Sequence, residues 1–125
     1  MRATNGRAMK AKGSAFERAV VEYLRAHGFP YAERYYGAGR HEDRGDIAGV
    51  VGWTVEAKAC RTFDLAGWAD EASRERDAAS SRYAAVVVRR PRRPVQDAYV
   101  VLSLATWAEL LGDEALPEPE VRHDQ

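Results

Sequence analysis

The sequence predicts a single α/β domain in which a mixed β-sheet is flanked by helices. Apolar residues recur at helical spacing over 14–27, whereas short apolar runs within 47–60 and 83–89 indicate strands. These helical and strand patterns alternate along the chain, as they do in α/β proteins. With 125 residues, 46% of them hydrophobic, the chain is long enough for one core and too short for two.

The first part of the chain predicts a flexible basic arm followed by a helix. Residues 1–12 are small, polar or basic and show no apolar periodicity, so they either contact phosphates or form a disordered terminus. The apolar spacing predicts a helix over 14–27, which Gly28 ends. A strand over 29–36 and a charged, glycine-rich loop over 37–45 follow.

The stretch 46–60 carries the residues on which the functional interpretation depends. Asp46 opens one apolar run, and Gly52 marks the turn into a second. In an extended strand alternate side chains share a face, so Glu56 and Lys58 are expected together, opposite the residues that point into a core. A hairpin between the two runs would bring Asp46 across from both.

A second helix and a buried strand follow this stretch. The helix is expected over 66–80, with Glu71 on its solvent-exposed side. Trp68 is expected to be a packing residue of this helix rather than a surface on which bases stack. The run 83–89, rich in valine, predicts a strand that is buried on both faces.

The last third of the chain begins with a basic turn. Residues 89–94 contain four arginines interrupted by two prolines, which excludes an interior strand. A strand over 99–104 and a short helix over 105–111 come next. Residues 113–125 are rich in proline and acids and predict a disordered acidic tail. The folded domain is therefore expected to span 13–112.

The formal net charge is zero, but the charge is unevenly distributed. Residues 1–108 contain 18 of the 19 Lys+Arg and 13 of the 19 Asp+Glu, a net charge of +5, and 109–125 carry −5. A basic body with an acidic appendage is typical of proteins that bind nucleic acid. The excess of arginine over lysine has a second explanation, which is a GC-rich genome.

Several classes of protein are disfavoured by the sequence. No apolar run approaches the ~20 residues of a membrane helix, and no signal-peptide pattern begins the chain, so we expect a soluble cytoplasmic protein. The single cysteine, Cys60, excludes an internal disulfide and disfavours a structural zinc site. No nucleotide-binding GxxxxGK[ST] motif occurs, and we expect no small-molecule cofactor.

Two carboxylates beside a lysine suit the hydrolysis of phosphodiesters. Carboxylate oxygens bind Mg²⁺, which acidifies a bound water and neutralises charge on a phosphate, and Mn²⁺ suits the same oxygen ligands. A lysine orients the attacking water or stabilises the developing negative charge. Asp46, Glu56 and Lys58 are therefore candidates for a metal-dependent site. The alternative is that Glu56 and Lys58 form an exposed cross-strand pair.

These three residues resemble the signature of the PD-(D/E)XK nuclease superfamily, with Gly45 at the position where many members have proline. The chain is further similar to archaeal-type and phage Holliday junction resolvases. The residues shared with those proteins are Lys12-Gly13, Glu17-Arg18, Gly28-Phe29 and the following Arg34. The resemblance spans roughly residues 12–111, and its second half is similar only in pattern.

The resemblance implies a restriction-endonuclease-like fold and a Mg²⁺-dependent DNA endonuclease. It implies that Asp46 and Glu56 are the principal metal ligands, that the carbonyl of Ala57 completes the coordination, and that Lys58 positions the water or stabilises the transition state. A homodimer would suit the substrate, because a two-fold axis allows paired nicks in a four-way junction.

Glu17 has two interpretations. The resemblance implies an auxiliary catalytic acid that binds the metal or its water. Alternatively, Glu17 closes a capping box that begins at Ser14 and satisfies a backbone N–H at the start of the helix. The sequence departs from the archaeal relatives in one respect, since no definite serine can be matched in the glycine loop before Asp46.

Ten basic residues are predicted to contact DNA, mainly through phosphates, which position a protein without reading sequence. They are Lys12, Arg18, Arg34, Arg40, Arg44, Arg61, Arg89, Arg90, Arg92 and Arg93. The last four form the basic turn, which would hold a DNA arm away from the scissile bond. For the loop and the turn the alternative is a solvated segment with scattered charge.

Two other functions remain open at this point. One is a different nuclease of the same superfamily, of the restriction, repair or flap type. The other is a DNA-binding module that keeps the fold but does not cut. A preference for four-way junctions separates a resolvase from the first, and metal-dependent cleavage separates it from the second.

Overall fold

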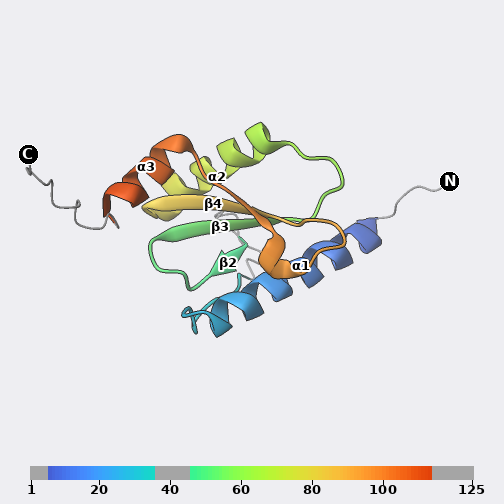
Figure 1. Ribbon diagram of the computed structural model, residues 1–125. Helices are drawn as coiled ribbons and strands as arrows, with labels where there is room; N and C mark the ends of the chain where they lie inside the picture. Colours follow the sequence, from blue (N-terminus) through green and yellow to red (C-terminus); the bar gives the residue numbers. More distant parts are fainter. Residues whose placement is uncertain (1–5, 36–45, 114–125) are drawn as a thin grey trace, which may run out of the picture.

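The computed structural model describes residues 6–35 and 46–113, which form a sheet with helices on both faces (Figure 1). The strands are β1 (Glu33–Arg34), β2 (Ile47–Ala48), β3 (Trp53–Lys58), β4 (Tyr83–Val88) and β5 (Tyr99–Val101). The helices are α1 (Gly6–Ala26), α2 (Leu65–Ala79) and α3 (Leu104–Asp113), with a short 3₁₀ helix, η1 (Val95–Asp97). The predicted loop with Arg40 and Arg44 lies outside the described residues, as do positions 114–125 of the predicted tail.

Parallel and antiparallel pairs are combined in one sheet. The strand order is β1-β2-β3-β4-β5 within the described ranges. The strands β3 and β4 run parallel, in register from Trp53 with Tyr83 to Lys58 with Val88, and α2 connects them. The other neighbouring strands are antiparallel. The prediction of an α/β domain with a mixed sheet flanked by helices is confirmed.

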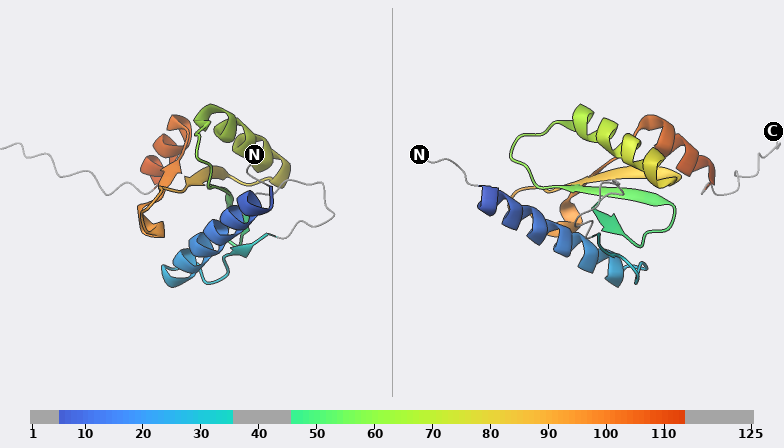
Figure 2. Two further views of the ribbon diagram at one scale, coloured as in Figure 1. Left: turned by 90° about the vertical axis from the view of Figure 1, so that its right-hand side faces the viewer. Right: turned by 180° about the vertical axis from the view of Figure 1, so that it is seen from behind.

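The helices cover opposite faces of the sheet, with α1 on one face and α2 and α3 on the other (Figure 2). On the α1 face, Phe16 and Val20 pack with Ile47 and Val55. The cluster on the α2 face consists of Ala72, Ala84, Val86 and Val88. The central strand β3 therefore lies between two packed layers.

The burial of β3 on both faces decides whether Glu56 and Lys58 form an exposed pair on the surface of the sheet. Val55 belongs to the core under α1, whereas Glu56 lies with the carboxylates of α2. Thr54 is 0% exposed and Glu56 is 3% exposed, so the second face of the strand is covered as completely as the first. The predicted alternation along the strand is correct, but the alternative of an exposed pair between Glu56 and Lys58 is wrong.

The first helix begins earlier than predicted. It starts at Gly6, so residues 6–12 are helical and do not form a flexible arm. Alanine, methionine, lysine and arginine in this stretch are all good helix formers, which favours extension even without apolar periodicity. The capping-box interpretation of Ser14 is therefore wrong, because position 14 lies inside the helix rather than at its start.

Three strands are shorter than predicted, for local reasons. The segment before β1 turns at Pro30, where the N–H of Ala32 donates to the carbonyl of Phe29 (3.1 Å). After β2 the chain turns at Gly49, whose φ is +87°. The strand β5 ends because Ser103 instead caps α3, its Oγ accepting a hydrogen bond from the N–H of Thr106 (3.0 Å).

No helix within 6–35 and 46–113 combines the length and the apolar character that crossing a membrane requires.

Candidate metal centre and active site

The pairing of β2 with β3 holds Asp46 beside Glu56. Ile47 pairs with Val55, and the N–H of Asp46 donates to the carbonyl of Val55 (2.9 Å). The Oδ2 atom of Asp46 accepts a hydrogen bond from the N–H of Ala57 (2.8 Å). Burial raises the pKa of Asp46, while this N–H and the charge of Lys58 oppose the rise. The predicted hairpin therefore brings the two acids together.

Glu56 is a buried carboxyl group in a crowded acidic environment. Burial raises its pKa to about 10, and its hydrogen bond with Glu75 and the charge of Asp46 act in the same direction. Its Oε2 atom is inaccessible to solvent and has no hydrogen-bond partner among the described residues. A buried acceptor of this kind is costly in an inert structure, and cation binding is one way to satisfy it.

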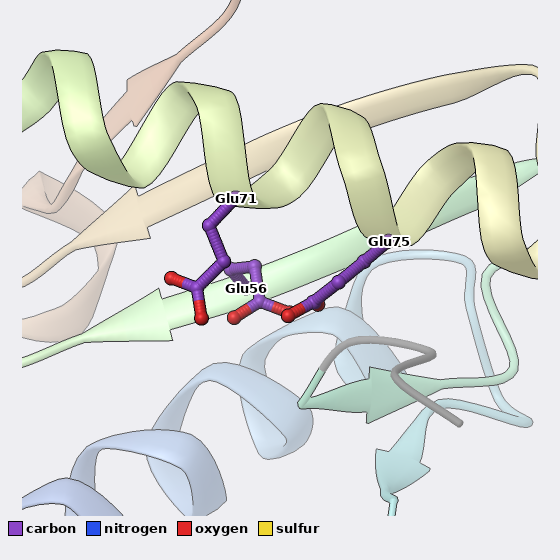
Figure 3. A group of neighbouring side chains, drawn as sticks. All are labelled: Glu56, Glu71 and Glu75. Carbon is purple, nitrogen blue, oxygen red and sulfur yellow. The ribbon is translucent and has the colours of Figure 1, made fainter. Parts of the chain in front are cut away.

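The helix α2 adds two glutamates that lie over Glu56 (Figure 3). One carboxylate oxygen each from Glu56, Glu71 and Glu75 lie within 4.8 Å of one another. Around an octahedral Mg²⁺ with ligands at 2.0–2.1 Å, adjacent oxygens lie about 3 Å apart and opposite ones about 4 Å, so the three oxygens would have to move closer together to bind one ion. With this movement the three glutamates could hold a metal ion.

The sequence-based prediction that Glu71 lies on the solvent-exposed side of its helix is correct only in part, because its side chain keeps 38% exposure but its carboxylate faces the acidic cluster. Glu71 points into the acidic cluster and accepts a hydrogen bond from Lys58, and Glu75 is 7% exposed. A signal was present, because Trp68, Glu71 and Glu75 recur at intervals of three and four residues, the spacing of one helix face. Polar residues at these positions concealed the buried face of the helix.

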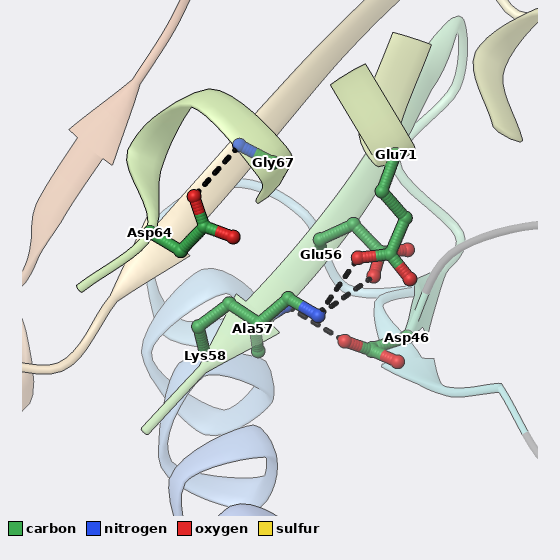
Figure 4. Close-up of polar contacts among 7 residues, drawn as sticks. All are labelled: Asp46, Glu56, Ala57, Lys58, Asp64, Gly67 and Glu71. Carbon is green, nitrogen blue, oxygen red and sulfur yellow. Dashed lines mark hydrogen bonds and ion pairs between the residues drawn. The ribbon is translucent and has the colours of Figure 1, made fainter. Parts of the chain in front are cut away.

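Lys58 lies at the centre of the carboxylates (Figure 4). Its Nζ atom is 3.0 Å from Oε1 of Glu71 and 4.0 Å from Oε1 of Glu56. Burial works against the charged form, but the hydrogen bond to Glu71 and the charges of Glu56 and Asp46 outweigh it and raise the pKa of Lys58. The lysine is thus held protonated and fixed in position at neutral pH.

Glu17 approaches the cluster from α1. Burial raises its pKa, and the negative charge of Asp46 raises it further, so the two carboxylates interact. Its Oε1 atom also accepts a hydrogen bond from Nε of Arg34 (3.0 Å), and Arg34 donates a second bond to Ser14 (3.1 Å). Arg34, predicted to contact phosphate, therefore joins α1 to β1, and its role toward DNA stays a prediction.

Five of the predicted DNA contacts line two adjoining clefts. The first cleft, of about 440 Å³, contains Lys12, Lys58 and Arg61. The second, of about 240 Å³, lies between α1 and the segment after β4 and is also bordered by Lys12. We call the cations of both clefts the basic surface, which consists of Lys12, Arg61, Arg89, Arg90 and Arg93.

Three other predicted contacts, among the residues that the structure describes, lie outside these clefts. Arg18 borders a separate groove with Arg34, and this groove also contains the acids Glu22 and Glu33. Arg92 is exposed and has a φ of +63°. Within the basic surface, Arg93 is 3.0 Å from Asp97, which neutralises part of its charge.

No protein-family model matches the chain, and neither a curated protein nor a solved structure matches it. The functional conclusion therefore depends on the geometry and chemistry of the site itself.

Proposed function

We propose that this protein is a metal-dependent DNA endonuclease of the PD-(D/E)XK superfamily, acting as a Holliday junction resolvase. One observation carries the proposal. Asp46 and Glu56 meet across the β2–β3 pair beside a protonated Lys58, and Glu56 has a buried oxygen without a hydrogen-bond partner in the described chain. A purely structural ion pair between Asp46 and Lys58 has no need for this second, buried carboxyl group.

The order of elements supports a restriction-endonuclease-like fold. A helix precedes the sheet, two paired strands carry the acids, and a helical crossover leads to a parallel strand. This is the arrangement that the resemblance of Asp46, Glu56 and Lys58 to the nuclease signature implies. The site lies at the carboxyl end of β3, bordered by the cleft that contains Lys12 and Arg61.

The oxygen donors of the site are of the type that a hard divalent cation binds. Asp46 and Glu56 would hold it, with the carbonyl of Ala57 and a carboxylate of α2, from Glu71 or Glu75, completing the oxygen ligands. Mg²⁺, or Mn²⁺ in its place, would supply an acidified water and neutralise charge on the phosphate.

The side chains of the site have separate tasks in hydrolysis. The oxygen of the attacking water forms a bond to phosphorus while the bond between phosphorus and the departing oxygen breaks. The proton that the water gives up passes through solvent to the departing oxygen. Lys58 stays protonated, so it attracts the negative charge that develops on the phosphate and orients the water, rather than acting as a base. Glu71 holds Lys58 in place at 3.0 Å. Glu17 would be the auxiliary acid that binds the metal or its water.

A homodimer would supply the paired nicks of a resolvase. Large apolar side chains are exposed along one side of α3, where a second copy could bury them. These are Leu104 at 75% exposure, Trp107 at 52% and Leu111 at 52%. Exposed apolar residues that share one side of a helix in this way favour an interface.

The deciding experiment is cleavage of a labelled immobile four-way junction. Linear duplex, flap and single-stranded DNA of matching sequence are assayed beside it, with and without Mg²⁺, and Asp46→Asn is the inactive control. Symmetric, metal-dependent nicks on the junction that vanish in the variant are the expected result. If duplex or flap DNA is cut as well as the junction, the protein is a nuclease but not a Holliday junction resolvase. Binding without cutting under any metal and pH would indicate a DNA-binding module.

A further inference from the structure

An aromatic cluster lies on the same side of the sheet as the candidate active site. The ring centroid of Phe63 is 5.8 Å from that of Trp68 and 6.2 Å from that of Tyr99. Trp68 packs on the core beneath α2, whereas Phe63 is 41% exposed and Tyr99 is 45% exposed. The cluster of Phe63, Trp68 and Tyr99, which we call the aromatic platform, thus has a fixed base and an open surface.

The sheet register places the platform close to Lys58. Lys58 of β3 pairs with Val88 of β4, and Val88 pairs with Tyr99 of β5. Side chains at paired positions point to the same face of a sheet, and Val88 belongs to the core beneath α2. Tyr99 is therefore two strand spacings from Lys58, about 10 Å. This is roughly three steps along a stacked nucleic-acid strand, at about 3.4 Å per nucleotide.

Cations accompany the rings. The guanidinium carbon of Arg90 lies 5.1 Å from the ring centroid of Tyr99. Arg61, two residues before Phe63, lines the same cleft as Lys58. A phosphate backbone that enters the cleft at Lys58 would therefore meet positive charge on its way to the rings.

The combination of rings and cations favours one kind of ligand. Single exposed aromatic residues are common on protein surfaces, but here two open rings adjoin each other and an arginine. An apolar peptide or a lipid tail would cover the rings but offer no negative charge to the arginines. An unpaired nucleotide uses both, because its base stacks on the rings and its phosphate pairs with the cations.

We propose that the aromatic platform, with Arg90, stacks an unpaired nucleobase of DNA held at the metal site. This inference rests on the proposed nuclease function and narrows its substrate to DNA with an unstacked base within a few nucleotides of the scissile phosphate. Branch points and flaps offer such bases, and continuous duplex does not.

The test measures binding without cleavage, using the full chain in the absence of added metal. The probe is a branched oligonucleotide carrying the fluorescent base 2-aminopurine, unpaired at the branch, and a continuous duplex of the same sequence is its control. Stacking on an aromatic ring quenches this base. The variants are Phe63→Leu and Tyr99→Leu, and Tyr99→Phe is the conservative variant that keeps the ring. The matched controls are Phe29→Leu and Tyr31→Leu, which remove exposed rings from the segment between α1 and β1.

The parent protein is expected to quench the unpaired probe. Each leucine variant should lose the quenching and bind the branched probe about tenfold more weakly, with unchanged affinity for duplex. Tyr99→Phe and both control variants should behave like the parent. The platform is overturned if Phe63→Leu and Tyr99→Leu quench as the parent does, or if they weaken the binding of branched and duplex DNA equally. A parent that binds neither DNA would overturn the nuclease proposal together with the platform.

Discussion

Replacing Glu56 with glutamine should stabilise the metal-free protein at alkaline pH while removing its stabilisation by Mg²⁺. The parent must keep a carboxyl group with 3% exposure beside the carboxylates of Asp46 and Glu75. Glutamine has nearly the same shape and cannot ionise. The variant therefore separates the cost of the buried acid from the contribution of the bound ion.

The magnitude follows from the pKa of Glu56, which burial raises from 4.5 to about 10 in the folded protein. Below pH 4.5 both the folded and the unfolded chain hold the proton of Glu56, so this group does not change the free energy of unfolding. At higher pH only the unfolded chain releases it, and each pH unit up to the folded pKa lowers the free energy of unfolding by about 1.4 kcal/mol. At pH 8 the destabilisation that Glu56 causes reaches an upper limit of about 5 kcal/mol. Relaxation of the neighbouring carboxylates reduces the gain in stability expected for Glu56→Gln to about 2–4 kcal/mol.

Urea denaturation at pH 5 and pH 8, with and without Mg²⁺, measures the effect. Without metal, Glu56→Gln should be more stable than the parent at pH 8 and nearly equal to it at pH 5. At tenfold excess over its dissociation constant, Mg²⁺ should stabilise the parent by about 1.4 kcal/mol and the variant hardly at all. Glu22→Gln, at an exposed position on α1, is the control. It should change neither the free energy of unfolding without metal nor the stabilisation by Mg²⁺. A variant less stable than the parent at pH 8 without metal would refute the reasoning.

Three further predictions test the fold, the proposed DNA surface and the proposed dimer. Gly49→Ala should destabilise the protein by at least about 3 kcal/mol in thermal or urea denaturation, because a Cβ at this position would overlap the carbonyl of Tyr31. Gly52 has a similar φ but open space around it, so Gly52→Ala should destabilise the protein by only about 1–2 kcal/mol. Equal destabilisation by the two variants would contradict this packing. The basic turn contains Arg89, Arg90, Arg92 and Arg93. Replacing all four by glutamine at the same time should weaken DNA binding and lower the slope of log K against log salt by about 0.9 for each phosphate that the turn no longer neutralises. An unchanged slope would show that this turn does not belong to the DNA surface. Trp107→Glu should convert a dimer to a monomer in sedimentation velocity without loss of helix content, and a parent that is already monomeric would exclude α3 as the interface.

The sequence alone determined the strand that carries the site. Alternation in an extended chain is a local property, so the shared face of Glu56 and Lys58 followed from their spacing. The turn at Gly52 similarly implied that Asp46 would lie across from them. The mixture of helical and strand periodicities was enough to predict the α/β class with its mixed sheet.

Other features did not follow from apolar periodicity or from spacing along the chain. The start of α1 was missed because residues 6–12 have helix propensity without an apolar pattern. The pairing of Arg34 with Glu17 joins α1 to β1, and no rule of spacing predicts it. The contact between Phe63 and Tyr99 joins positions 36 residues apart and arises only when β5 pairs with β4.

The tertiary structure alone decided the surroundings of Glu56. Spacing showed which side chains share a face of β3, but the crossover from β3 to β4 determined what covers that face. Because α2 packs there, Glu71 and Glu75 join Glu56, and a carboxyl group that solvent could have stabilised becomes a buried acid with a strongly raised pKa. Local geometry thus selected the residues, and the packing of the next helix, α2, across the sheet set their protonation and their capacity to hold a metal ion.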